Sequence, residues 1–236
     1  MKKQNILEAT FLDRPNRFLS RVDLKGEITE AFVPNPGRMY ELMVPGKKVY
    51  LRPNSGQHRK TAYDMIAVMH DGILISIDSN LPNRFMKRIL QNHELNIFRD
   101  YNRIKPEPSM YEGRFDFLLS GKKKILIEVK SCTLVVNNRA IFPDSPTIRG
   151  ARHMKHLADA LVEGIVDEAY VVFVIQRPDA EIFSPNDETD PNFGNMLRES
   201  HKLGVKVVPI VTELVDWDLK VRKIVPYDLK YFINMD

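Results

Sequence analysis

Two carboxylates and a lysine stand at positions that a β-hairpin would bring together. Asp116 lies in one apolar run, and Glu128 and Lys130 lie in the next, with a lysine-rich turn between the two runs. If Leu119 pairs with Ile125 across this turn, Asp116 lies opposite Glu128, and strand alternation puts Lys130 on the same face as Glu128. The spacing therefore predicts that the three side chains converge on one face of a sheet.

This arrangement predicts a magnesium site. Carboxylates directly opposite each other on a sheet face lie about 5 Å apart and repel, so we expect a cation between them. Mg²⁺ takes oxygen ligands, and a nearby lysine can stabilise an attacking hydroxide or a phosphate oxygen. We therefore predict Asp116 and Glu128 as metal ligands and, together with Lys130, as catalytic residues. The alternative is a surface hairpin with solvated acids and an ordinary cross-strand contact between Glu128 and Lys130.

The surrounding sequence predicts a mixed α/β domain over residues 79–236, with helices packed on a central sheet. Helices are indicated by apolar residues at helical spacing between capping residues, and buried strands by continuous apolar runs. The expected elements are helices from Pro82, from Thr147 to Gly164 and from Asp190 to Gly204, and strands at 103–109, 169–175 and 205–211.

The helix that starts near Thr147 carries a basic stripe beside its apolar one. Its members recur at i, i+3, i+4 and i+7, and they are Arg149, Arg152, His153 and His156. Such a stripe suits a phosphate backbone or the open side of a cleft. A plain solvated helix face is the alternative interpretation.

Residues 1–78 predict a small β-barrel. Lys25-Gly26 and Asp71-Gly72 are two-residue turns between runs typical of strands, which indicates two hairpins. A short helical turn at 38–44 and a strand at 48–52 lie between them. Five strands in so short a stretch indicate a barrel of the oligonucleotide/oligosaccharide-binding (OB) type. An SH3-like barrel would give a similar pattern.

The basic charge is concentrated near the N-terminus. Residues 1–60 carry twelve Lys or Arg and six Asp or Glu, whereas the whole chain has a net charge of only +4. This surplus indicates an anionic partner, and nucleic acid before others, although scattered solvating charge is the alternative. The predicted nucleic-acid contacts in the barrel are Arg14, Arg17, Arg21 and Arg38. Phe11 and Phe18 are expected in the core.

The composition excludes some kinds of site and indicates the cellular compartment. The single cysteine, Cys132, excludes an internal disulfide and a cysteine-rich zinc site. No run of eighteen apolar residues occurs, so no membrane span is expected, and the N-terminus lacks a signal-peptide pattern. A cytoplasmic protein fits best, and the sequence leaves a homodimer open.

The order of several short motifs resembles one known family. The motifs are Pro15-Asn16-Arg17-Phe18, Asn35-Pro36-Gly37-Arg38-Met39, Pro82-Asn83-Arg84, Arg114-Phe115-Asp116-Phe117, Glu128-Val129-Lys130-Ser131, Phe142-Pro143-Asp144, Thr147 with Arg149-Gly150 and His153, and Gln176-Arg177. Together they resemble the sugar fermentation stimulation protein A family, within the PD-(D/E)XK nuclease-like superfamily. The resemblance implies an OB-type barrel, a nuclease-like α/β domain and DNA binding of low sequence specificity. It also implies a regulatory link to sugar metabolism, maltose use in particular.

The resemblance also implies roles for individual residues. Asp116 and Glu128 match the metal-binding acids and Lys130 the motif lysine, while Arg149 and His153 match a segment expected to face the cleft. Gly113 stands where the family pattern has a serine, which removes one hydroxyl from the cleft edge. Two further acids, Glu94 and Glu107, are candidates for a third metal ligand, although an ordinary solvated glutamate is the simpler interpretation of each.

Three functions are compatible with these residues. The first is a DNA-binding protein of low sequence specificity with a Mg²⁺ site, acting as a regulator of sugar metabolism. The second is an active Mg²⁺-dependent nuclease on DNA or RNA, which the intact Asp116, Glu128 and Lys130 favour. The third is a sugar-binding protein, which has less weight because a neutral sugar has no use for the basic N-terminal surplus.

Overall fold

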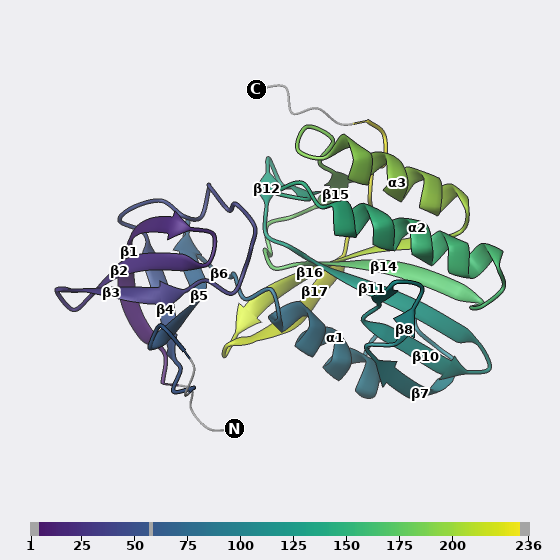
Figure 1. The fold of residues 1–236 in the computed structure, drawn as a ribbon, viewed down its shortest axis with the longest axis horizontal. Helices are drawn as coiled ribbons and strands as arrows, with labels where there is room; N and C mark the ends of the chain where they lie inside the picture. Colours follow the sequence, from purple (N-terminus) through teal and green to yellow (C-terminus); the bar gives the residue numbers. More distant parts are fainter. Residues whose placement is uncertain (1–4, 57–58, 232–236) are drawn as a thin grey trace. The chain divides into compact units, whose positions relative to one another are not determined.

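The computed structural model describes residues 5–56 and 59–231 (Figure 1). The chain divides into two compact units, one formed by Met1–Leu81 with Glu213–Lys220 and the other by Pro82–Thr212 with Val221–Asp236. Across the described ranges, no helix is both long enough and apolar enough to cross a membrane.

The N-terminal unit is a closed barrel. Five strands pair in the order β3-β2-β1-β4-β5, a parallel β3–β5 pairing closes the ring, and β6 extends it beside β5. Phe11, Val22 and Met65 lie among the buried side chains that fill its interior. The strands are β1 (Leu7–Asn16), β2 (Leu19–Leu24), β3 (Glu27–Phe32), β4 (Lys48–Pro53), β5 (Tyr63–His70) and β6 (Ile73–Ser76). This architecture confirms the predicted OB-like barrel.

Both predicted hairpins of the barrel are confirmed, but its longest strand was not predicted. The β2–β3 hairpin turns at Lys25-Gly26 and the β5–β6 hairpin at Asp71-Gly72, with positive φ at all four residues. Strand β1 buries only Ala9 and Phe11 completely, so its alternating apolar pattern is too short to stand out. The helical turn expected at 38–44 is only a hydrogen-bonded turn, in which Leu42 and Met43 donate to the Met39 carbonyl.

The second unit is built on a mixed six-stranded sheet, as predicted. The strand order is β17-β16-β14-β11-β10-β7, in which β11, β14 and β16 are parallel and β10 runs antiparallel to both its neighbours. Strand β14 is buried along nearly its whole length, which confirms the interpretation of its continuous apolar run. The strands are β7 (Tyr101–Pro106), β10 (Phe117–Gly121), β11 (Lys124–Cys132), β14 (Glu168–Ile175), β16 (Lys206–Val215) and β17 (Asp218–Ile224).

Three helices cover the two faces of this sheet. Helices α2 (Ile148–Val162) and α3 (Pro191–Lys202) lie side by side on one face, and α1 (Leu81–Gln91) lies on the other (Figure 1). Thr147 and Asp190 cap α2 and α3 as predicted, each accepting from a backbone N–H with its side chain. Val162 is exposed in the last turn of α2.

Several short strands of this unit were not predicted. A small sheet has the order β12-β13-β15, and a separate hairpin pairs β8 with β9. Strands of two to four residues carry too little alternation to be detected in a sequence. Their bounds are β8 (Ser109–Met110), β9 (Gly113–Arg114), β12 (Val135–Val136), β13 (Arg139–Phe142) and β15 (Ile182–Pro185).

Candidate metal centre and nucleic-acid interface

The β10–β11 hairpin has the predicted register. Leu119 pairs with Ile125, and the ladder ends with Phe117 opposite Ile127. Asp116 precedes this ladder, and its Oδ2 accepts a hydrogen bond of 2.6 Å from the Val129 N–H on β11. The Asp116 carboxylate therefore reaches across to β11, beside Glu128, although Asp116 is not a ladder partner of Glu128.

Glu128 has one carboxylate oxygen held and the other unpaired. Its side chain is about 4% exposed, on the same face of β11 as Leu126, which packs in the core under α2. Oε1 accepts from Lys130 Nζ at 2.6 Å and from His153 Nδ1 at 2.6 Å. Oε2 is buried and has no hydrogen-bond partner among the described residues. A buried carboxylate oxygen without a donor is costly, and a bound cation would satisfy it.

The two acids differ in their ionisation. Burial raises the pKa of Asp116 to about 6, with the charge of Glu128 adding to the effect, against the opposing influence of the Val129 N–H and Lys130. Burial also acts to raise the pKa of Glu128, but Lys130 and His153 outweigh it, so this pKa lies below its usual value. Glu128 therefore ionises at a lower pH than Asp116, and above about pH 6 the two carboxylates repel each other.

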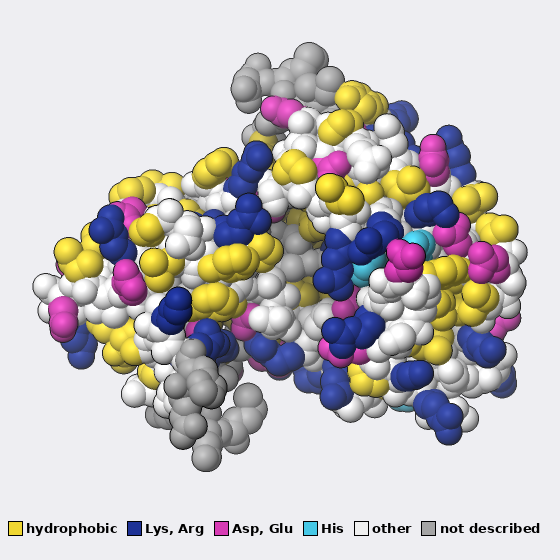
Figure 2. All heavy atoms as spheres, viewed as in Figure 1, with side chains coloured by type: hydrophobic (Ala, Val, Ile, Leu, Met, Phe, Trp, Pro, Cys, Tyr) yellow, Lys and Arg dark blue, Asp and Glu magenta, His cyan; other side chains and the backbone are white. Residues whose placement is uncertain are grey.

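His153 is buried against Glu128, which corrects the expectation that it lies exposed on the basic stripe. The ring is about 4% exposed and packs near Phe115. Arg149 Nε donates to His153 Nε2 at 3.4 Å, so the ring proton lies on Nδ1 and is donated to Glu128. The sheet buries this edge of the stripe, so of its four members only Arg149 and Arg152 are exposed. In Figure 2, Lys and Arg side chains gather at the start of α2.

Asn83 is a site residue that the sequence did not assign. It lies in the first turn of α1, and its Nδ2 donates to Asp116 Oδ1 at 2.6 Å. With Val129 on the other oxygen, both Asp116 oxygens are oriented by neutral donors. Its motif, Pro82-Asn83-Arg84, was noticed only as part of a resemblance, because an amide carries no charge that would mark it for a metal site.

Neither candidate for a third acid joins the site. Glu94 lies beyond the far end of α1, where it accepts from Arg88 Nη1 at 2.9 Å. Glu107 is exposed and pairs with Arg114 at 3.2 Å. Within the described ranges, no three or more His, Cys, Asp and Glu side chains gather as a metal site. The available protein ligands are therefore Asp116 and Glu128, and one or two carboxylates with several waters is the usual set for Mg²⁺.

The four predicted barrel arginines fall into two classes. Arg14 donates to four backbone carbonyls, those of Arg17, Asn35, Gly37 and Arg38, so these bonds give it a structural role, and its contact with nucleic acid stays a prediction. Arg21 pairs with Asp13 through two hydrogen bonds. The side chains of Arg17 and Arg38 are exposed and form no ion pair with a described residue. These two remain available for an anion.

The two phenylalanines expected in the barrel core have different environments. Phe11 is buried, as predicted. Phe18 is about 44% exposed and stacks on Phe32, with ring centroids 6.1 Å apart and planes 11° from parallel. Phe18 is not in the core because it lies in the β1–β2 turn. The prediction assumed that the alternation of a strand already applied at this residue.

Comparison with known proteins identifies the family. The sequence model described as the SfsA N-terminal OB domain matches residues 12–77, and that of the sugar fermentation stimulation protein RE domain matches residues 80–216. A sugar fermentation stimulation protein homolog of Desulfitobacterium hafniense is 42% identical over 217 residues, covering 92% of this chain and 93% of that protein. One from Moorella thermoacetica is 44% identical over 206 residues, covering 86% and 88%.

A solved structure agrees with these relatives. Pyrococcus furiosus SfsA, described as a complex with Ca²⁺, is 29% identical and superposes with a TM-score of 0.87, covering 97% of this chain and 98% of that one. The two family sequence models match mainly one unit of the chain each, and the relatives extend over both units. The chain therefore belongs to the sugar fermentation stimulation protein family.

Proposed function

We propose that this protein binds DNA with low sequence specificity and holds Mg²⁺ at Asp116 and Glu128. The observation that carries the proposal is the buried, unpaired Oε2 of Glu128 beside an acid whose pKa is raised to about 6. A divalent cation would satisfy the oxygen and remove the repulsion between the acids. The Ca²⁺ in the Pyrococcus furiosus relative supports this assignment, because Ca²⁺ and Mg²⁺ both take oxygen ligands.

DNA binding is supported by exposed cations in both units. Arg149 and Arg152 lie on α2 near the metal site, and Arg17 and Arg38 lie on the barrel. Exposed arginines bind the phosphate backbone, which carries no sequence information, so low specificity follows. The proposal places the protein in the cytoplasm, as a regulator of sugar metabolism with maltose use as the predicted case, and the family description supports the link to sugar.

A second candidate function is Mg²⁺-dependent cleavage of DNA or RNA, which the position of Lys130 favours. When bound, Mg²⁺ would lower the pKa of water and neutralise charge on the phosphate. Lys130 Nζ, which is mostly buried and 2.6 Å from Glu128 Oε1, would stabilise charge that develops on a phosphate oxygen. His153 and Asn83 would hold the two acids in place throughout the reaction.

The test compares Glu128→Gln with Glu94→Gln, a matched control outside the site. Mg²⁺ binding is measured by isothermal titration calorimetry, DNA binding by fluorescence anisotropy, and cleavage with labelled DNA and RNA. We expect Glu128→Gln alone to lose Mg²⁺ binding while DNA binding in the absence of metal stays near the wild-type value. Equal Mg²⁺ affinity in both variants would overturn the metal site. Absence of cleavage by the wild type with either Mg²⁺ or Mn²⁺ would overturn only the second candidate function.

A further inference from the structure

We propose that the barrel carries a base-stacking site for single-stranded nucleic acid, formed by Phe18 and Tyr40 and flanked by Arg17 and Arg38. The inference rests on the proposed nucleic-acid binding and specifies its substrate class on the barrel. It lies outside the Asp116–Glu128 centre and uses none of the residues there.

One partly buried side chain, Arg14, organises this surface through its hydrogen bonds. The Arg14 guanidinium donates to the Arg17 carbonyl at 2.5 Å and to the Arg38 carbonyl at 2.8 Å, and it also holds the carbonyls of Asn35 and Gly37. The β1–β2 turn and the loop at 34–38 are thereby fixed to a single side chain. Arg17 and Arg38 are consequently held near each other at the backbone, while their own guanidinium groups are exposed. Such preorganisation lowers the entropic cost of binding an anion.

Each of these arginines is accompanied by an exposed aromatic ring. Phe18 follows Arg17 directly, and one face of its ring lies against Phe32. Tyr40 lies two residues after Arg38 and is about 75% exposed. Between Arg38 and Tyr40, Met39 is buried with φ of +50°, so the chain turns around an anchored side chain and presents both neighbours outward.

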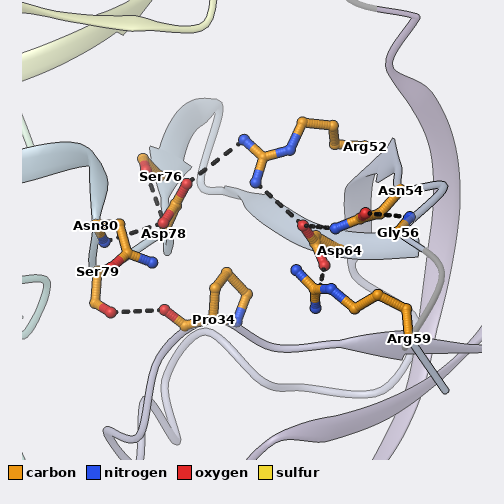
Figure 3. A network of polar contacts seen from close by, with 10 residues as sticks. All are labelled: Pro34, Arg52, Asn54, Gly56, Arg59, Asp64, Ser76, Asp78, Ser79 and Asn80. Carbon is orange, nitrogen blue, oxygen red and sulfur yellow. Dashed lines mark hydrogen bonds and ion pairs between the residues drawn. The ribbon is translucent and has the colours of Figure 1, made fainter. Parts of the chain in front are cut away.

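The ring that Phe18 contacts, Phe32, is itself contacted by a cation. Arg59 lies over the Phe32 ring, with its guanidinium carbon 4.9 Å from the ring centroid. Arg59 is itself held by Asp64 at 3.1 Å, within the polar network of Figure 3. Phe32 therefore contacts both the held guanidinium of Arg59 and the exposed ring of Phe18. A rigidly backed aromatic face is suited to receive another flat ring.

The chemistry of this surface selects single strands. Bases in a duplex are stacked on each other, whereas those of a single strand can stack on aromatic side chains while cations follow the phosphates. A neutral sugar would use the rings but leave two free arginines without a partner. A duplex would use the arginines but leave two exposed rings without a role. Of these three ligands, single-stranded nucleic acid is the one that uses both kinds of side chain.

The aromatic part is tested by fluorescence anisotropy with a labelled oligothymidine of about 15 nucleotides, a length suited to one OB barrel, and with a duplex of equal length. Phe18→Ala and Tyr40→Ala should each weaken single-strand binding by about 5- to 100-fold, as expected for loss of one stacked base. Duplex binding should change little, and Phe18→Tyr should retain affinity. The control is Ile28→Ala, which removes an aliphatic side chain that is about 70% exposed on the same barrel.

The cationic part is tested by the salt dependence of the same binding. Arg17→Ala and Arg38→Ala should each reduce the slope of log affinity against log salt by about 0.7, the value for one phosphate contact on a single strand. Arg21→Ala should have less effect, because Asp13 already pairs with that guanidinium. Unchanged slopes in both the Arg17 and Arg38 variants would overturn the flanking role.

The outcomes separate this inference from the proposed function. Wild-type protein that binds neither single-stranded nor duplex DNA at low salt would overturn the proposed function and the inference together. Wild-type protein that binds DNA, with Phe18→Ala and Tyr40→Ala both within about twofold of it on single strands, would overturn the inference alone. That twofold margin lies well below the loss expected for one stacked base.

Discussion

Each unit of this protein holds a pair of neighbouring acids, and the two pairs differ in the cations that contact them. In the barrel, Asp64 and Asp78 are both buried, and Arg52 reaches both, at 3.2 Å and 3.5 Å respectively. Arg59 adds a second cation on Asp64, so two arginines serve two acids (Figure 3). Charges buried in this way are paired, as a stable interior requires.

The acids of the second unit have fewer partners. Lys130 is the cation that contacts Glu128, while the donors on Asp116 are the neutral amides of Asn83 and Val129. The pKa of Asp116 rises to about 6 as a result of burial and of the Glu128 charge. The contrast shows that burial of an acid does not by itself indicate a metal site. The informative feature is a buried acid whose surroundings supply too little positive charge.

The largest expected effect comes from unbalancing the barrel pair. Arg52→Ala removes the cation shared by Asp64 and Asp78, so it should lower the free energy of unfolding by about 2–3 kcal/mol, less than the ~3–5 kcal/mol of fully buried pairs because the Arg52 side chain is 29% exposed. Urea unfolding measures the change. Arg21→Ala, which breaks an exposed pair with Asp13, is the control and should have a much smaller effect. A loss no larger than that of the control would show that the barrel acids do not depend on this balance.

The second effect concerns the residue that positions Glu128. His153→Ala removes one of the two donors to Oε1, so Mg²⁺ affinity should fall by about 10- to 100-fold, as is usual when a partner behind a metal ligand is lost. Titration calorimetry measures the affinity, and His153→Gln, which keeps an N–H donor, should restore part of it. His156→Ala is the control on the same helix, since that ring stacks on Tyr111 and not against the site. Unchanged Mg²⁺ affinity in a folded His153→Ala would contradict the positioning role.

The parts of the site that follow from local pattern could be predicted from the sequence. The Leu119–Ile125 register depends on two apolar runs and the turn between them, so the convergence of Glu128 and Lys130 was expected. The caps at Thr147 and Asp190 are equally local. These signals lie within a few residues of the element that they define.

The parts that depend on distant contacts could not be predicted. Asn83 meets Asp116 across 33 residues, and no spacing rule links a helix start to a strand in this way. Periodicity placed His153 on the basic stripe of α2, but only the position of the sheet decides which edge of a stripe is buried. Likewise, Arg14 could not be distinguished from Arg17, because both are cations near a turn and only the folded loop at 34–38 supplies the carbonyls.

The third prediction concerns removal of an acid, where the first concerned removal of a cation. Asp116→Asn removes the acid but turns one of its two acceptor oxygens into an N–H donor, so the charge effect is measured as a change with pH. Between pH 4 and pH 7.5 the metal-free variant should gain about 1–2 kcal/mol of stability relative to the wild type. The pKa of Asp116 is raised from 3.8 to about 6 on folding, so the wild type loses stability as the pH rises through that window. The stability of the variant relative to the wild type should therefore increase from about pH 4 to about pH 6, with no further change below about pH 4. Urea unfolding measures the stability difference across this pH range, and a difference that does not change between pH 4 and pH 7.5 would contradict the raised pKa of Asp116.

The smallest effect is expected at Gly113, beside His153. A Cβ at this glycine would lie 3.7 Å from His153 Nε2, which is ordinary contact, so the serine of the family pattern fits here. In Gly113→Ser the hydroxyl can donate to Nε2 and favour the Nδ1 proton that His153 gives to Glu128, which should change stability by less than about 1 kcal/mol. Gly113→Ala, with the same Cβ and no hydroxyl, is the control. A hydroxyl adds a dipole and no net charge, so stabilisation by Mg²⁺ in thermal unfolding should persist in both variants. If Gly113→Ser abolished the stabilisation by Mg²⁺, the hydrogen bonding of His153 would decide whether the site takes a cation. The contrast between Asp116–Glu128 and the barrel pair Asp64–Asp78 would then not be one of charge.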